Sequence, residues 1–230
     1  MTMNSPRFRL QCWKGNTQTE VSQHQLAFSE NAPGRAQLTI KGDADPKQIV
    51  AIDLGWGDSV KRVFTGYIER VSPGKPGYVQ IFCRELAAVL YHPWHVVMRH
   101  PTLAGILSNL SQQTGLQFVF PDNAYSQTAI PCFYSTGNGY RLLDDLGQAF
   151  NIPDYIWQQQ GDGRIFVGSW ADSYWADKAV DLPNNIMNPN QALKKATLPC
   201  IPHLKPGVIV NGRKLASVEH TGTETVIQWT

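Results

Sequence analysis

The sequence is poor in charged residues. Asp, Glu, Lys and Arg make up 17% of the 230 residues, whereas about 25% is usual in soluble domains. This low share predicts that partner proteins cover part of the surface. The 20 Lys and Arg against 18 Asp and Glu leave a formal charge of +2, without the concentrated basic charge that nucleic-acid binding needs. We therefore expect protein partners and no nucleic acid.

The sequence also lacks closely paired cysteines and long apolar runs. Its four cysteines, Cys12, Cys83, Cys132 and Cys200, form no CxxC pair, and each lies in or beside an apolar run where a thiol acts as a small hydrophobic group. A reducing compartment fits this pattern. No apolar stretch is long enough to span a bilayer, and no apolar segment follows the first basic residues. We expect a protein made and kept in a cytoplasm, away from membranes.

Catalytic signatures are missing. The sequence contains no GxSxG, no P-loop and no GxGxxG, and the loop Ser135–Gly139 lacks a phosphate-binding Lys. Asp144 and Asp145 are adjacent on a predicted helix, so they point about 100° apart and suit a solvated helix face better than acid–base catalysis. His203 and His220 could act as general bases, but no nucleophile stands at a recognisable spacing. We predict no enzyme, no catalytic residue and no cofactor.

Three histidines lie close together in the middle of the sequence. His92, His95 and His100 surround Trp94. No Cys, Asp or Glu accompanies them at zinc-type spacing, and two prolines interrupt any helix that would align the imidazoles. We interpret them as surface or loop residues and predict no metal site.

The first third of the chain has the period of β-strands. Apolar residues alternate with polar ones, and Gly and Pro clusters separate the alternating runs. Five strands in about eighty residues indicate a small barrel or sandwich. We predict these strands over residues 7–13, 36–41, 49–54, 62–71 and 78–84.

The middle of the chain changes to a helical period. Thr102 is a predicted N-cap, and the apolar residues that follow at helical spacing end at Gly115, which suits the C′ position. We predict a strand over residues 116–120, a second helix that opens near Gly139, and a hairpin around the Gly161-Asp162-Gly163 loop. Together these elements predict an α+β insert.

The last fifty residues begin without periodicity. Residues 181–191 are rich in Pro and Asn, which predicts a linker or an extended arm. Strands follow over 208–210, 215–220 and 225–229, with Asn211-Gly212 as a hairpin turn. Three strands cannot close a core, so they must complete a sheet begun elsewhere in the chain or pair with a neighbouring subunit.

Three groups of motifs, taken in order, resemble the baseplate hub family of contractile-tail phages. That family includes the late-control D tail proteins and the N-terminal half of type VI secretion spike proteins. The motifs are Val63–Val71 followed by Cys83–Leu86; Pro101–Leu107 followed by Thr114-Gly115-Leu116; and Leu204–Gly207 with Asn211-Gly212 and Val218–Thr221.

The resemblance implies a mainly β fold with an α+β insert: two tail-tube-like β-barrels plus a small helical and β domain. We expect a first barrel over 1–85, the insert over 86–180, and a linker with strands completing the second barrel over 181–230. The implied protein is a homotrimeric ring in the baseplate of a virion tail, assembled in the bacterial cytoplasm. It would join the sixfold tail tube to a separate central spike protein and contact other baseplate proteins.

Three aromatic residues are candidates for the ring interface. Trp56, Tyr67 and Trp229 could contribute to contacts between subunits, or could be ordinary core residues. Surface Trp and Gly-rich loops also leave open a carbohydrate- or peptide-binding β module. An uncharacterised hydrolase is the third hypothesis.

Overall fold

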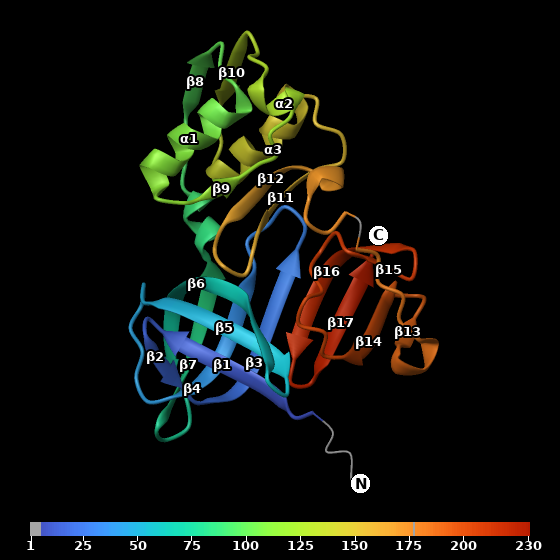
Figure 1. Ribbon diagram of the computed structural model, residues 1–230. Coiled ribbons are helices and arrows are strands. Elements are labelled where there is room, and N and C mark those ends of the chain that lie inside the picture. The colour runs from blue at the N-terminus through green and yellow to red at the C-terminus, as the bar shows by residue number, and fades with distance from the viewer. Residues whose placement is uncertain (1–5, 177) are drawn as a thin grey trace.

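The computed structural model of the chain describes residues 6–176 and 178–230. Its hydrophobic residues gather in three cores. Figure 1 shows the corresponding parts of the chain: a first β unit, a helical insert above it and a C-terminal β unit beside it. The predicted class, mainly β with an α+β insert, is confirmed.

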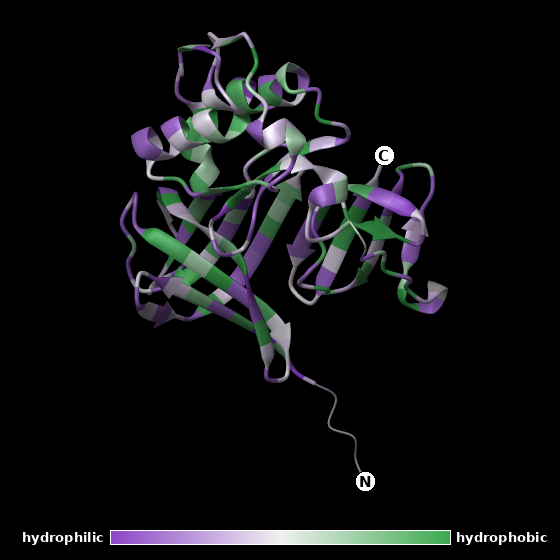
Figure 2. Ribbon diagram, turned by 45° about the horizontal axis from the view of Figure 1, so that its top comes forward, coloured by the Kyte–Doolittle hydropathy of each residue, from purple (hydrophilic) through white to green (hydrophobic). Residues whose placement is uncertain are grey.

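The first β unit contains seven strands around a core that includes Cys12, Leu26, Leu38, Ile52 and Phe64. Figure 2 shows apolar and polar residues alternating along them, as strands with one buried face require. All five predicted strands are present, but β2 and β3 were not predicted. A bulge between Val21 and Gln23 breaks the alternation in β3, which hides the strand from a period-two pattern. The strands are β1 (Phe8–Lys14), β2 (Thr17–Thr19), β3 (Val21–Ser29), β4 (Arg35–Lys41), β5 (Ile49–Trp56), β6 (Ser59–Pro73) and β7 (Tyr78–Glu85).

The insert follows β7 and supplies most of the helical structure. Its longest helix, α1, begins after Thr102, whose hydroxyl accepts a hydrogen bond from the Gly105 N–H at 3.0 Å, and ends at Gly115 with φ 74°. Both predicted ends are confirmed, as are the second helix and the hairpin. The insert contains the 3-10 helix η1 (Leu86–Tyr91), β8 (Val96–Arg99), α1 (Leu103–Thr114), β9 (Phe118–Val119), α2 (Ala124–Gln127), β10 (Cys132–Ser135), α3 (Gly139–Ala149), β11 (Tyr155–Gln159) and β12 (Ile165–Ser169).

The C-terminal unit corrects one prediction. Residues 181–191 are neither a linker nor an extended arm, because β13 within them pairs with β14. The predicted Asn211-Gly212 turn is present with φ positive at both residues, as a type I′ turn requires. The unit contains the 3-10 helices η2 (Trp170–Asp172) and η3 (Asn184–Ile186), β13 (Asn188–Asn190), β14 (Lys195–Pro199), β15 (Ile209–Val210), β16 (Arg213–Thr221) and β17 (Glu224–Trp229).

The two β units share one sheet. Strand β16 pairs antiparallel with β3, from Ser217 opposite Ser29 to Thr221 opposite Gln25. Among the described residues, twelve strands join in the order β13-β14-β17-β16-β3-β4-β7-β6-β5-β1-β2, with β15 beside β16. The C-terminal strands therefore complete a sheet begun elsewhere in the chain, which was the first of the two predicted possibilities.

The hairpin β11–β12 separates two of the cores. Trp157, Ile165 and Val167 belong to the core of the insert, whereas Ile156 and Phe166 belong to the C-terminal core. Neighbouring residues of a strand point to opposite faces, so one hairpin forms a wall of both cores. In the described part of the chain, no helix has the length and apolar character needed to cross a membrane.

Gly66 lies in β6 where the backbone of β7 passes very close to it. A Cβ atom at this position would lie 2.0 Å from the Arg84 carbonyl oxygen. We expect Gly66→Ala to lower the free energy of unfolding by roughly 1–3 kcal/mol, because the backbone must move to relieve the clash. Chemical denaturation measures the change. Gly105→Ala in α1, where the nearest atom would be 3.3 Å away, is the control, and equal losses for both variants would contradict the prediction.

Candidate functional site

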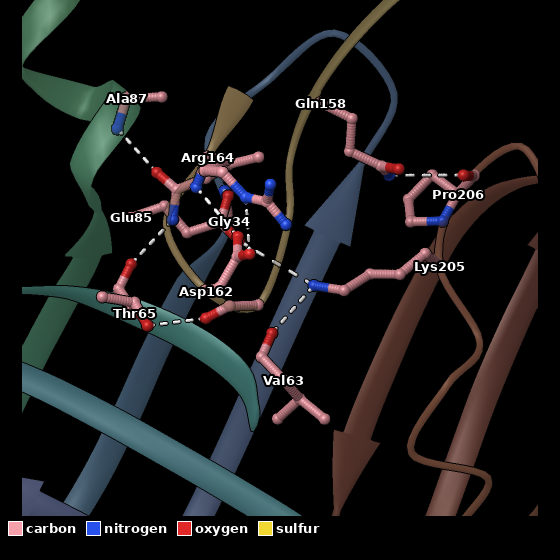
Figure 3. A network of polar contacts seen from close by, with 12 residues as sticks. Gly34, Val63, Thr65, Glu85, Ala87, Gln158, Asp162, Arg164, Lys205 and Pro206 are labelled. Atoms are coloured by element: carbon pink, nitrogen blue, oxygen red, sulfur yellow. Dashed lines mark hydrogen bonds and ion pairs between the residues drawn. The ribbon is translucent and has the colours of Figure 1, made fainter. Parts of the chain in front are cut away.

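A buried ion pair lies where the first β unit meets the C-terminal segment. Glu85, at the end of β7, is 2% exposed and Lys205 is 6% exposed. Their charged atoms are 3.8 Å apart. The Gly34 N–H donates to the Glu85 carboxylate at 2.6 Å, and Lys205 Nζ donates to the Val63 carbonyl at 3.0 Å. Figure 3 shows Lys205 reaching from the C-terminal segment toward both partners.

Burial shifts both pKa values toward the neutral forms. Desolvation raises the pKa of Glu85 to about 7, although the nearby Lys205 charge and the Gly34 N–H oppose the shift. Desolvation lowers the pKa of Lys205 to about 8, and Glu85 opposes that shift. Lys205 Nζ also lies 3.2 Å from the centroid of the Phe28 ring, a further favourable contact for a cation. Each charge is thus tolerable in the interior mainly because the other is present.

Gln159 ties the hairpin β11–β12 to the first β unit. Its side-chain amide donates to the Thr65 carbonyl at 2.7 Å and accepts from the Ala87 N–H at 2.8 Å. The Thr65 hydroxyl donates to the Gly161 carbonyl at 2.6 Å. Glu85, Lys205 and Gln159 together form what we call the junction, and it holds the three cores against one another.

The predicted interface residues occupy three different environments. The Trp56 indole N–H donates to the Cys200 carbonyl at 2.7 Å, so this side chain links the two β units within one chain. Trp229 is buried in the C-terminal core, with the Arg213 guanidinium 4.6 Å from its ring centroid. Tyr67 is half-buried and lines a surface groove of about 770 Å³ with Ile49 and Tyr91. Their role between subunits stays a prediction.

His220 is fully buried. Its Nδ1 lies 2.8 Å from the Thr225 hydroxyl oxygen and 3.8 Å from the Cys200 sulfur. Burial, together with the charges of Lys205 and His24, lowers the pKa of His220 to about 3. Burial raises the pKa of the Cys200 thiol, which disfavours the thiolate that nucleophilic chemistry needs. The arrangement therefore secures the β16–β17 hairpin.

His203 is exposed and shares a pocket with Asp162. Partial desolvation of the imidazole and the Lys61 charge lower the pKa of His203. The Asp162 carboxylate accepts a hydrogen bond from Arg164 Nε at 2.7 Å, so this carboxylate is engaged by its own loop. The pair therefore lacks the oriented contact that an acid–base site requires.

The remaining candidate residues have structural positions. Asp144 accepts a hydrogen bond from the Trp157 indole at 2.8 Å, and Asp145 accepts one from the Ser135 hydroxyl at 3.1 Å, so this pair is more than a solvated helix face. The loop 135–139 leads into α3, with Asn138 as its N-cap. The three clustered histidines, His92, His95 and His100, are exposed. Within residues 6–176 and 178–230, no group of three or more His, Cys, Asp or Glu could hold a metal ion.

The residues of the junction were not singled out from the sequence. Glu85 and Lys205 do lie inside two motifs that carry the family resemblance, Cys83–Leu86 and Leu204–Gly207. A charged residue inside an apolar run was the available signal, because such a residue is seldom buried without a partner. The identity of the partner, 120 residues away in sequence, was not available from any local pattern.

Comparisons with known proteins place the fold. No family model matches the sequence. The chain is 32% identical over 217 residues, 94% of its length, to an uncharacterised 58.7 kDa protein from the lys 3′ region of Haemophilus phage HP1. It spans only 40% of the length of that phage protein.

Solved structures of tail proteins are similar over nearly the whole chain. The 43 kDa tail protein of prophage MuSo2 from Shewanella oneidensis has a TM-score of 0.67 at 12% identity, covering 97% of this chain and 98% of that one. A tail protein from Neisseria meningitidis MC58 has a TM-score of 0.66 at 11% identity, covering 96% and 95%. An Escherichia coli type VI secretion component, described as similar to the T4 tail proteins gp27 and gp5, has a TM-score of 0.60 at 12% identity, covering 96% and 75%. The chain thus shares the fold of phage tail proteins.

The buried ion pair predicts a non-additive pair of substitutions. Glu85→Gln leaves the Lys205 ammonium buried without its carboxylate, and we expect a loss of about 3–5 kcal/mol in the free energy of unfolding. The double variant Glu85→Gln with Lys205→Met buries no charge, so it should lose less than the sum of the two single variants. Urea denaturation at pH 7 measures all four proteins. Additive losses would show that the two charges do not depend on each other.

His220 predicts a loss of stability in acid. Its pKa in the folded protein, about 3, lies below its usual value of 6.5, so the unfolded chain takes up the proton first as the pH falls. The free energy of unfolding that neutral His220 contributes above pH 6.5 should decline between pH 6.5 and 3, by at most about 1.4 kcal/mol per pH unit. Glu85 acts in the opposite sense between pH 4.5 and 7, because its raised pKa costs stability as the pH rises.

A comparison with His220→Gln isolates the histidine. Both proteins keep Glu85, so the difference between their unfolding free energies should shrink as the pH falls from 6.5 to 3. Thermal or urea denaturation across this range measures it. Parallel pH profiles for the two proteins would contradict the assignment.

Proposed function

We propose that this protein is a structural baseplate hub of a contractile injection system, a phage tail or a phage-like tail. The observation that carries the proposal is the fold shared with tail proteins over nearly the full length of both chains. The residues considered for catalysis support a structural role, because His220 is sealed in the interior and the Asp162 carboxylate near His203 is held by Arg164.

The proposed mechanism is geometric. Each chain contains two β units joined through the pairing of β3 with β16. Three chains in a ring would present six such units, so a threefold assembly could offer a pseudo-sixfold face. We propose that this face receives the sixfold tail tube while the threefold axis receives a central spike.

This role defines the partners and the location. The partners would be two further copies of the chain, the tail tube protein, the central spike protein and other baseplate proteins. The protein would act in the baseplate of the tail, after assembly in the bacterial cytoplasm. We propose three domains with the bounds expected from the sequence, 1–85, 86–180 and 181–230, with Trp170 and Val180 at the end of the second packed on the core of the third.

A ring of identical chains needs two different faces that meet head to tail. We propose that the groove lined by Ile49, Tyr67 and Tyr91 belongs to one of these faces. Its lining includes residues of β5, β6 and η1. Strands β5 and β6 lie near the β2 end of the twelve-stranded sheet and far from its β13 end. The exposed apolar side chains of the groove would lose their contact with water in a ring.

Light scattering tests the ring. We expect a mass of about 77 kDa, three times the 25.7 kDa chain. Ile49→Glu should shift the protein toward the monomer, because it places a charge in an apolar contact. Val97→Glu is the matched control, since Val97 is an exposed apolar residue on β8 of the insert, outside the groove. A wild-type protein that stays monomeric at high concentration would count against the hub, and a trimer unaffected by Ile49→Glu would exclude this groove.

A further inference from the structure

A second surface feature has the dimensions of a small-molecule site. A pocket of about 370 Å³ lies where β6, the loop between β11 and β12, the segment at Tyr174-Trp175 and the segment 202–205 meet. Binding sites for small molecules usually enclose about 300–1,000 Å³. Two residues of the junction, Gln159 and Lys205, are among the residues that line the pocket.

The pocket wall is held in place before any ligand arrives. A Cβ atom on Gly161 would lie 2.1 Å from the Arg62 carbonyl oxygen, and Gly163 has φ 96°. The loop backbone is therefore packed against β6 in a conformation that glycine permits. The hydrogen bond from the Thr65 hydroxyl to the Gly161 carbonyl fixes the same contact. A rigid wall lowers the entropic cost of binding.

The three cations that line the pocket, Arg62, Arg164 and Lys205, already have partners. Arg62 pairs with Asp53, Arg164 pairs with Asp162 at 2.7 Å, and Lys205 pairs with Glu85. A phosphate or carboxylate ligand would have to compete with these carboxylates for each cation. An uncharged ligand that accepts and donates hydrogen bonds needs no such exchange, so the pairing favours a neutral polar ligand.

The remaining lining combines aromatic rings with amides and an imidazole. Tyr174 is 67% exposed, although Lys178 Nζ lies 2.8 Å from its ring centroid, and it meets Trp175 edge to face with centroids 4.9 Å apart. Gln158, Gln160 and His203 also line the pocket and can donate and accept hydrogen bonds. The C–H face of a pyranose ring packs on an aromatic ring while its hydroxyls bond to planar polar groups, so the two kinds of side chain match the two sides of a sugar.

We propose that this pocket binds an uncharged pyranose unit of a glycan. The site is separate from the groove at Ile49 and does not depend on the ring, so the protein could bind the sugar as a monomer or as a trimer. A peptide ligand is less well matched, because a peptide would normally use an open sheet edge or a set of apolar pockets.

The experiment uses the full chain on an array of neutral, sialylated and sulfated glycans, with titration of the strongest neutral glycan by calorimetry. We expect binding to neutral glycans, and Tyr174→Ala should weaken it roughly tenfold by removing a stacking ring. Tyr134→Ala is the matched control, because Tyr134 and Tyr174 are 72% and 67% exposed and only Tyr174 lines this pocket. Both variants change solvent-exposed rings and should keep the wild-type thermal unfolding profile.

Several results would overturn the proposal: no neutral glycan bound, binding of acidic glycans alone, or equal affinity in wild type and Tyr174→Ala. Capture of unglycosylated peptides that competes with the neutral glycan would also overturn it in favour of a peptide site. Light scattering on the same samples keeps the two proposals apart, because a trimer that binds no glycan retains the hub and loses only this site.

Discussion

The pairing of β3 with β16 is the contact on which the rest of the structure depends. It joins strands from the first and last thirty residues of the chain, so the two β units become parts of one continuous sheet. The hydrogen bonds of a sheet are regular and satisfy the backbone at the seam. A hinge between the units would have to break them, and the pairing therefore makes a rigid pair of what could have been two loosely linked domains.

The junction supports this seam on the side of the insert. Glu85 ends β7 and Lys205 lies in the segment between β14 and β15, so the ion pair fixes the end of the first β unit to the C-terminal unit. Burying two charges is costly, and apolar residues of similar volume can be as stable. An ion pair adds selectivity for the correct arrangement of the two segments, since a misplaced segment would leave one charge alone in the interior. Gln159 fixes the hairpin β11–β12 in the same way, through its hydrogen bonds to Ala87 and Thr65. The two faces of this hairpin close two cores.

A rigid chain with two joined β units suits a structural component that has to keep its shape. The proposed hub would have to hold its neighbours at defined angles under load, and the hydrogen bonds and packed side chains of the described interior suit that task. The surface features lie apart from the seam: the groove at Ile49 beside β5 and β6, and the pocket at Tyr174 beneath the β11–β12 loop. Contacts with other copies of the chain and contacts with a ligand could then coexist on one scaffold.

The sequence by itself determined the elements whose causes are local. Thr102 and Gly115 bound α1 because a hydroxyl satisfies free N–H groups and glycine adopts positive φ, and Asn211-Gly212 turns a hairpin for the second of these reasons. The prediction of a linker or extended arm over residues 181–191 was wrong, because the turn-favouring Asn and Pro residues concealed the short strand β13, which pairs with β14 just after it. The tertiary structure alone decided that β16 joins β3, that Glu85 meets Lys205, and that Tyr174 lies beside the loop at Gly161. Such contacts depend on packing between distant segments, and no short stretch of sequence records which partner a strand edge or a buried charge will find.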